Sequence, residues 1–153
     1  MISKRGGTSV SWVKNQPSNG QGMARKNIME IDRKKALIVE DTIQIQDVIV
    51  AVLQDKGFIT YTAGDGNAGL ELLEKHNDID IIITDIFMPQ KEGIGFIRGV
   101  RQKYPTKKIM VITGAVNFDT ISKTAYDFGA NLTMKKPLNL DEFTCNIDHL
   151  ILT

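Results

Sequence analysis

The segment Ile79-Asp80-Ile81-Ile82-Ile83-Thr84-Asp85 decides the fold of this chain. It is a short run of β-branched apolar residues that ends in a carboxylate, and it is shorter than most helices. A strand that is apolar at successive positions is buried on both faces, which is typical of a parallel sheet covered by helices. The segment therefore predicts a central strand over residues 79–84, with Asp85 at its carboxyl end.

On either side of this segment, further short apolar runs predict four more strands, at residues 36–39, 58–63, 109–113 and 131–135. The segments between and after the strands carry apolar residues at helical spacing. They predict five helices, within residues 45–57, 67–76, 92–104, 118–129 and 140–150. Strands that alternate with helices of this length run parallel, because the chain has to cross back before the next strand begins. Right-handed crossovers then give a five-stranded parallel α/β sheet with helices on both faces.

Length and composition are those of an ordinary globular domain. The chain has 153 residues, of which 42% are apolar and 24% charged, and about 150 residues is usual for one domain. No apolar run is long enough to cross a membrane, and no secretory signal opens the sequence, so we expect a cytoplasmic protein without membrane insertion. A single cysteine, Cys145, excludes an intramolecular disulfide and a multi-cysteine zinc site.

The beginning of the chain differs from the remainder in charge. Residues 1–35 hold eight Lys and Arg against two acidic residues, whereas residues 36–153 hold eleven against sixteen. The beginning is also rich in Ser, Gly, Asn and Gln and has no sustained apolar period. We therefore expect a flexible basic leader over residues 1–34 and a folded domain over residues 35–153. Whether the leader is native or serves as an arm for an acidic partner stays open, while the acidic domain shows no nucleic-acid footprint.

Four of the five predicted strands deliver a polar or charged residue to one edge of the sheet. These residues are Glu40 and Asp41, Asp85, Thr113, and Lys136. Ligands of open α/β sheets bind beyond the carboxyl ends of the strands, so this edge is the candidate site. Three carboxylates there raise each other's pKa unless a cation joins them. Lys136 supplies one positive charge, and Mg²⁺, which prefers oxygen ligands, suits the remainder.

Taken alone, each of these residues also has a structural interpretation. Asp41 can cap the helix that follows it, Thr113 can be a turn residue, and Lys136 can be a solvated charge. Their convergence from different strands favours a site instead. An aspartate beside Mg²⁺ can attack a phosphoryl group and form an acyl phosphate. The metal and Lys136 can then stabilise the phosphoryl charge, and Thr113 can hydrogen-bond one of its oxygens.

Taken in order, the sequence motifs resemble those of the receiver domain of two-component response regulators. The matching pieces are Leu37-Ile38-Val39-Glu40-Asp41, Asp85-Ile86-Phe87-Met88-Pro89 with Gly93 after it, Met110-Val111-Ile112-Thr113-Gly114-Ala115, Gly129-Ala130, and Lys136-Pro137. The resemblance extends over residues 35–153. It implies a flavodoxin-like sheet with the strand order 2-1-3-4-5, which is the order of a known member of this family.

The resemblance also implies the acceptor and the metal site. Asp85 matches the aspartate that accepts the phosphoryl group. Asp41 matches a direct Mg²⁺ ligand, and Glu40 matches an acid that acts on the ion through water. Asp85 itself and the backbone carbonyl of Phe87 are the other implied ligands.

The remaining catalytic and switch residues are implied in the same way. Thr113 matches the hydroxyl residue that turns toward the phosphoryl group, Lys136 matches the lysine that pairs with it, and Lys136-Pro137 matches a bond that is usually cis. The family usually has Tyr or Phe three residues before this lysine, as part of the switch, and here that position is Thr133. Phe87 is bulky and apolar, and we hypothesise that it hinders the water that hydrolyses the phosphorylated state.

These implications predict a signalling domain rather than a classical enzyme. We expect the receiver to stand alone, because no further domain follows the last predicted helix. A sensor histidine kinase or a histidine phosphotransfer protein is the expected phosphodonor. The new charge is expected to switch a surface of the fourth helix, fifth strand and fifth helix. That surface, around Ile121, Tyr126, Thr133 and Phe143, is expected to bind a downstream protein target or a second copy of the chain, and no nucleic acid.

Three alternative functions have weaker support. A phosphorylation-independent docking module stays open, because Thr133 departs from the family pattern. A Mg²⁺-dependent phosphatase needs a second acid two residues beyond Asp85, where Phe87 stands. A nucleotide-binding protein needs a glycine-rich phosphate loop, and no Gly-x-Gly-x-x-Gly follows the first strand.

Overall fold

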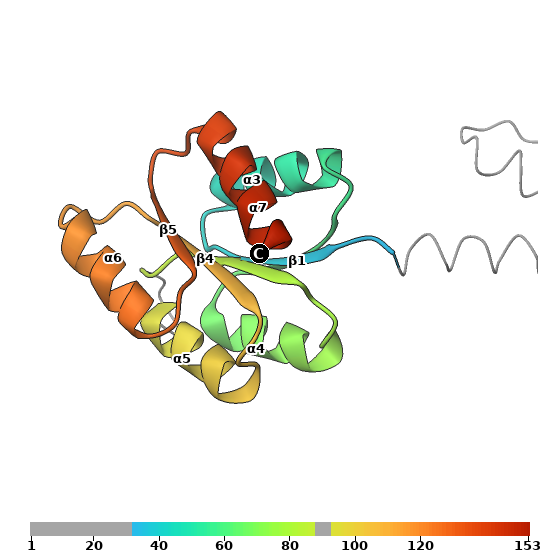
Figure 1. Cartoon of the computed structure of the whole chain (residues 1–153), viewed down its shortest axis with the longest axis horizontal. Coiled ribbons are helices and arrows are strands. Elements are labelled where there is room, and N and C mark those ends of the chain that lie inside the picture. Colours follow the sequence, from blue (N-terminus) through green and yellow to red (C-terminus); the bar gives the residue numbers. More distant parts are fainter. Residues whose placement is uncertain (1–31, 88–92) are drawn as a thin grey trace, which may run out of the picture. The chain divides into compact units, whose positions relative to one another are not determined.

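The computed structural model describes residues 32–87 and 93–153 (Figure 1). Residues 1–31, which make up most of the expected leader, lie outside the described residues, as does the Met88–Pro89 part of one sequence motif. The flexible leader over residues 1–34 therefore stays a prediction.

Five parallel strands form one sheet in the described part of the chain. They are β1 (Lys35–Val39), β2 (Ile59–Ala63), β3 (Ile81–Thr84), β4 (Lys108–Thr113) and β5 (Leu132–Lys135). Their order across the sheet is β2-β1-β3-β4-β5, and every neighbouring pair is parallel. The predicted α/β class and the strand order 2-1-3-4-5 are confirmed.

One helix follows each strand. The helices are α3 (Ile43–Asp55), α4 (Gly66–Lys75), α5 (Gly93–Lys103), α6 (Phe118–Asp127) and α7 (Leu140–Leu152). Helices α3 and α7 cover one face of the sheet, and α4, α5 and α6 cover the other (Figure 1). Within the described residues, no helix has both the length and the apolar character that a membrane span requires.

Each face of the sheet has its own apolar core. Successive side chains of a strand point to opposite faces. In β3, Ile82 therefore belongs to the core that contains Phe96 of α5, whereas Ile81 and Ile83 belong to the core that contains Phe143 of α7. All five side chains are at most 1% exposed. The apolar run that predicted a doubly covered strand is explained by these two cores.

Glycine and aspartate residues mark the predicted helix ends. Gly57 and Gly129 follow α3 and α6 with φ of 89° and 112°, a left-handed conformation that favours glycine. Asp65 caps α4, where its carboxylate accepts a backbone N–H of the first turn at 2.9 Å. The N-cap of α3 is Thr42 and not Asp41. The capping interpretation of Asp41 is therefore wrong.

Three side chains depart from the expected pattern of burial. Val48 of α3 and Leu140 of α7 belong to predicted apolar stripes, yet they are 42% and 45% exposed. In both helices, the apolar residues extend beyond the part of the helix surface that packs on the sheet. Phe143, expected at a partner-binding surface, is wholly buried, because it fills the core under α7. Tyr126, expected at the same surface, is exposed.

Two cations hold the amino ends of the strands together. The guanidinium of Arg101 donates to the carbonyls of Gly129 and Lys107, at 2.9 and 2.7 Å, and to the side-chain oxygen of Asn131 at 2.8 Å. The ammonium of Lys107 donates to the carbonyl of Ile79 at 2.7 Å. These bonds join the segments that lead into β3, β4 and β5. We call Arg101 and Lys107 with these bonds the amino-edge clasp.

Candidate phosphoacceptor and metal site

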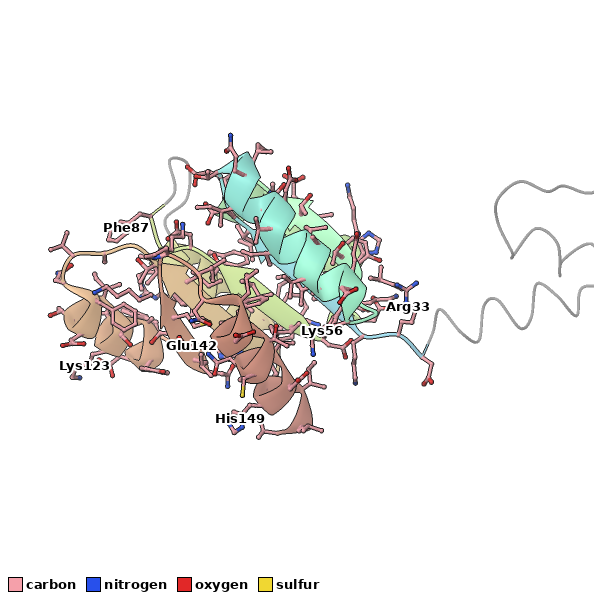
Figure 2. The ribbon with its side chains drawn as sticks, turned by 90° about the horizontal axis from the view of Figure 1, so that it is seen from above. Arg33, Lys56, Phe87, Lys123, Glu142 and His149 are labelled. Carbon is pink, nitrogen blue, oxygen red and sulfur yellow. The ribbon has the colours of Figure 1, made fainter. Side chains whose placement is uncertain are left out.

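The candidate site lies at the carboxyl edge of the sheet, opposite the amino-edge clasp. Its predicted residues follow or end four strands: Glu40 after β1, Asp85 after β3, Thr113 at the end of β4, and Lys136 after β5. Because the strands are parallel, these positions share one edge. In Figure 2, Phe87 marks this edge at one end of the domain.

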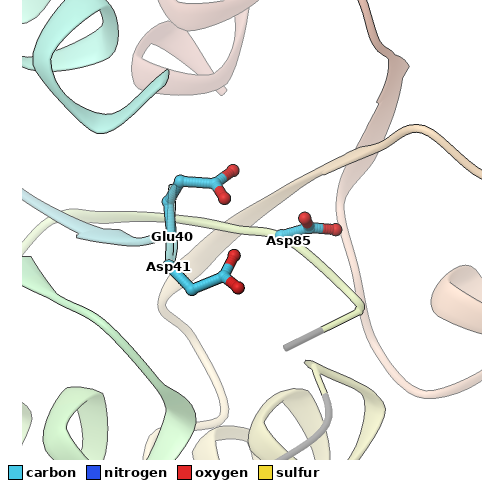
Figure 3. A group of neighbouring side chains, drawn as sticks. All are labelled: Glu40, Asp41 and Asp85. Carbon is cyan, nitrogen blue, oxygen red and sulfur yellow. The ribbon is translucent and has the colours of Figure 1, made fainter. Parts of the chain in front are cut away.

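Three carboxylates gather at this edge (Figure 3). One oxygen from each of Glu40, Asp41 and Asp85 lies within 4.8 Å of the others. Glu40 is 2% and Asp85 7% exposed, whereas Asp41 is exposed. The structure thus places two of the acids below the surface and one at the entrance, and it brings together the three side chains that the sequence predicted.

Lys136 is the cation of this cluster. Its Nζ lies 2.8 Å from Glu40 Oε2 and 2.8 Å from Asp85 Oδ2, and it donates a hydrogen bond to each. The bond between Lys136 and Pro137 is cis, as the resemblance implied. One ammonium thus faces two buried carboxylates, while Asp41 adds a third negative charge at the entrance.

At Glu40, burial shifts the pKa more than repulsion from Asp85 does. Burial raises the pKa of the Glu40 carboxyl above its ordinary value, although hydrogen bonds from Lys136 and the Thr42 amide oppose it. The charge of Asp85 contributes least to that rise. Burial also lowers the pKa of the Lys136 ammonium, but its hydrogen bonds to Asp85 and Glu40 outweigh burial, so that this pKa is raised. Lys136 therefore stays charged at neutral pH.

Backbone amides fix the other oxygen of each buried carboxylate. Asp85 Oδ1 accepts the amides of Ile86 and Phe87 at 2.6 and 3.1 Å. Glu40 Oε1 accepts the amide of Thr42 at 3.1 Å. Each buried carboxylate thus has one oxygen bound to the main chain and one bound to Lys136, which holds both in fixed orientations.

The two predicted switch residues lie in different surroundings. Thr113 is wholly buried, and its hydroxyl accepts the amide of Ala115 at 3.2 Å. Thr133 contacts α6 instead, where its hydroxyl shares a hydrogen bond with Ser122 and its amide donates to the Tyr126 hydroxyl at 3.2 Å. Thr113 therefore lies at the carboxyl edge of the sheet, where the candidate site is. Thr133 packs against helix α6 instead.

An open pocket gives access to Asp85. It has a volume of about 450 Å³ and is lined by Asp85, Phe87, Gly114, Ala115, Val116, Asn117 and Lys136. Phe87 and Val116 are 57% and 101% exposed, so that two apolar side chains flank the entrance. As the described residues line it, the pocket is wide enough for a phosphoryl group.

Some supporting residues were not found from the sequence. Gln46 donates through its side chain to the carbonyls of Glu40 and Ala63, at 3.1 and 3.4 Å. Thr84 donates through its hydroxyl to the carbonyl of Asp85 at 2.8 Å. For Thr84 a signal was present, since it is a polar residue at the end of an otherwise apolar run. Gln46 sits in a helix with many polar residues, and its sequence context carries no such signal.

The sequence of the chain matches the model of the response regulator receiver domain over residues 36–148. The chain belongs to this family. Receiver domains are signalling domains that bind Mg²⁺ in an acidic pocket and interact with histidine kinases and downstream targets.

The match covers a different share of the length of each relative. Identity is 30% over 113 residues to the transcriptional regulatory protein CpxR of Escherichia coli K12, across 74% of this chain and 47% of CpxR. It is 32% over 117 residues to the cell cycle transcriptional regulator CtrA of Caulobacter vibrioides, across 76% and 50%. It is 30% over 119 residues to a probable chemotaxis protein CheY of Rhizobium etli, across 76% and 92%. The receiver thus spans about half of the two transcriptional regulators and nearly all of the chemotaxis protein.

Solved structures show the same fold. CheY4 of Vibrio cholerae matches with a TM-score of 0.72 at 28% identity, across 77% of this chain and 98% of CheY4. A CheX–CheY–BeF3–Mg²⁺ complex from Borrelia burgdorferi matches with a TM-score of 0.74, across 78% and 90%. Its identity of 22% supports the fold alone.

Proposed function

We propose that this receiver domain accepts a phosphoryl group on Asp85. The observation that carries the proposal is the position of the Asp85 carboxylate. It lies beside two further carboxylates, it is held by the ammonium of Lys136, and it lines an open pocket. A carboxylate in this position is a nucleophile with access to a donor, and the charge of its product has a fixed cation beside it.

We further propose that Mg²⁺ binds at Glu40, Asp41, Asp85 and the backbone carbonyl of Phe87. The donor set fits a hard cation, because it consists of oxygen atoms from three carboxylates within 4.8 Å of one another. The single ammonium of Lys136, which contacts two of them, leaves negative charge for a divalent ion. When bound, the ion supplies charge neutralisation for the phosphoryl oxygens. Membership of the receiver domain family, whose members bind Mg²⁺ in an acidic pocket, supports this use of the cluster.

The proposed reaction is a substitution at phosphorus. An oxygen of Asp85 attacks the phosphorus of a phosphohistidine, so that a P–O bond forms while the P–N bond breaks and the imidazole leaves with the electron pair. Lys136 neutralises charge on the transferred oxygens. The Thr113 hydroxyl accepts the amide of Ala115 and keeps its own proton to donate to one of those oxygens. Water later hydrolyses the acyl phosphate and returns Asp85 to its carboxylate form.

An apolar groove beside the site supports a protein as the donor. The groove has a volume of about 400 Å³ and is lined by Gln44, Ile45, Val48, Lys136, Pro137, Leu138 and Leu140. Lys136 lines both this groove and the Asp85 pocket. A helix of a histidine kinase or phosphotransfer protein that covers Val48 and Leu140 therefore brings its phosphohistidine close to Asp85.

The output of the domain is proposed from the same geometry. A surface of α6, β5 and α7, with exposed Tyr126 but without Phe143, is the proposed contact for a downstream protein or a second copy. The match to nearly all of a chemotaxis protein supports a receiver that acts alone. The half-length matches to CpxR and CtrA support a receiver joined to an effector domain equally well.

The experiment that tests the proposal is intact-protein mass spectrometry after incubation with acetyl phosphate, with and without Mg²⁺. We expect one added phosphoryl group that requires Mg²⁺ and is absent from Asp85→Asn. Asp55→Asn, a change at an exposed aspartate of α3, is the matched control and should be phosphorylated like the wild type. No added mass under any condition would contradict the proposal and favour a phosphorylation-independent docking module.

A further inference from the structure

A buried hydroxyl lies directly before the proposed phosphoacceptor. Thr84 is the last residue of β3 and is 1% exposed. Its Oγ1 donates to the carbonyl oxygen of Asp85 at 2.8 Å. The three residues before it, Ile81–Ile83, are apolar and equally buried. A hydroxyl at such a position has to find a partner, and here that partner belongs to the reacting residue.

The carbonyl that Thr84 contacts lies in a tightly packed place. The first residue of α5, Gly93, approaches it so closely that an added Cβ would lie 2.2 Å from the Asp85 oxygen. The amide of Gly93 donates to the next carbonyl, that of Ile86, at 2.7 Å. Within residues 32–87 and 93–153, the Thr84 hydroxyl is the hydrogen-bond donor to the Asp85 carbonyl. The peptide after Asp85 is therefore held between a hydroxyl and the start of a helix.

The same stretch of backbone orients the Asp85 carboxylate. The amides of Ile86 and Phe87 bind Asp85 Oδ1 at 2.6 and 3.1 Å, which leaves Oδ2 to Lys136. A rotation of the peptide after Asp85 moves the Ile86 amide, the carboxylate that it holds and the Phe87 carbonyl together. The orientation of this one peptide thus sets the positions of two proposed metal ligands, the Asp85 carboxylate and the Phe87 carbonyl.

We propose that Thr84 is a positioning residue, whose hydroxyl fixes the peptide after Asp85 so that the carboxylate and the Phe87 carbonyl face the acidic cluster. This inference rests on the proposed function, because it assigns Thr84 to the preparation of the same site. Packing alone does not require a hydroxyl at this position, since valine is β-branched like threonine and suits a buried strand. Groups that orient metal ligands typically change metal affinity or activity by roughly 10–100-fold when removed.

The test compares Thr84→Val, which deletes the hydroxyl, with Thr84→Ser, which keeps it. We expect Thr84→Val to be phosphorylated by acetyl phosphate at least about tenfold more slowly and to need a higher Mg²⁺ concentration. Thr84→Ser should restore the rate to within about twofold. The control Ile82→Val deletes a methyl group from the same strand and face, and it should lower the thermal midpoint without slowing phosphorylation.

Equal rates in Thr84→Val and wild type, or a Thr84→Ser variant as slow as Thr84→Val, would overturn the inference. A second readout separates it from the proposed function. Mg²⁺ titration followed at the amide resonances of Ile86 and Phe87 needs no phosphoryl transfer. If the wild type takes no phosphoryl group, the proposed function fails, whereas Thr84 still has to change the Mg²⁺ affinity. An unchanged affinity in Thr84→Val would then reject its positioning role.

Discussion

Glu40 is a carboxylate whose surroundings disfavour its charge. Burial raises its pKa in the folded protein despite the hydrogen bonds from Lys136 and the Thr42 amide. A raised folded pKa means that the folded state binds the proton more tightly than the unfolded state. The ionised form therefore weakens the metal-free fold, and protonation as the pH falls through the folded pKa removes that cost.

The first prediction concerns Glu40→Gln, which imitates the protonated form. In buffer with a chelator at neutral pH, the variant should have a higher free energy of unfolding than the wild type. This advantage should shrink as the pH is lowered through the folded pKa of Glu40, because the wild type then becomes neutral as well. Urea unfolding at a series of pH values measures it, and a difference that grows at low pH would reject the argument.

The second prediction concerns Phe87, which is 57% exposed and lines the Asp85 pocket. We propose that its ring shields the phosphorylated Asp85 from water, and we therefore expect Phe87→Asn to hydrolyse its phosphoryl group several-fold faster. The decay of phosphorylated protein, followed by intact mass after removal of the donor, measures the rate. Phe87→Leu retains an apolar side chain and should stay close to the wild type. An unchanged rate in Phe87→Asn would refute the shielding role.

Residues that carry the site were predictable where they follow buried strands. Asp85 follows an apolar run, and parallel strands bring such positions to one edge. Side-chain partners across the fold were not predictable. That Thr133 meets Ser122 and Tyr126 depends on how α6 packs on β5, which no spacing in the sequence encodes.

At the scale of elements, the start of α5 is fixed by a close approach of two backbones. A Cβ on Gly93 would lie 2.2 Å from the Asp85 carbonyl oxygen and 2.4 Å from the Ile86 Cα. Both contacts are with main-chain atoms, which cannot move aside as a flexible side chain can. Helix α5 therefore reaches its place beside Asp85 only because its first residue has no side chain.

The third prediction compares two alanine substitutions in this helix. Gly93→Ala should lower the free energy of unfolding by about 1–3 kcal/mol, as overpacking usually does. At Gly99, an added Cβ would lie 3.5 Å from the Leu70 side chain, an ordinary contact, and Gly99→Ala should stabilise by about 0.5–1 kcal/mol. Chemical denaturation measures both variants, and equal effects of the two changes would contradict the structure.

Element types were predicted well, and their boundaries less so. Gly57 and Gly129 end their helices as expected, because both adopt positive φ. Ile79, expected as the first strand residue, is buried but precedes β3, which begins at Ile81. Its carbonyl accepts Lys107 instead of pairing with a neighbouring strand. Such a side-chain bond from a distant loop is invisible in local sequence.

At the scale of the whole molecule, we expect the acidic edge to couple Mg²⁺ binding to the stability of the fold. Three clustered carboxylates repel one another in the folded state and are dispersed in the unfolded chain. An ion that binds the folded state alone stabilises it by mass action, by about 2.7 kcal/mol at a hundredfold excess over the dissociation constant.

The fourth prediction follows from this coupling. Adding Mg²⁺ should raise the thermal midpoint of the wild type, and a chelator should reverse the rise. Asp41→Asn, which removes the exposed carboxylate of the cluster, should weaken the response, whereas Asp55→Asn should leave it intact. Differential scanning calorimetry over a range of Mg²⁺ concentrations measures the effect. If the thermal midpoint of the wild type does not change with Mg²⁺ concentration, the proposed metal site is contradicted.

The amino-edge clasp of Arg101 and Lys107 has a mechanical consequence for this molecule. One end of the sheet is cross-linked by two long cations that bind main-chain carbonyls, while the other end carries the reacting groups on loops. We expect a displacement that begins at Asp85 to meet a fixed support at the far end and to stay within the near half. The domain would then behave like a beam anchored at one end, which bends most at its free tip, the carboxyl edge that holds the proposed phosphoacceptor.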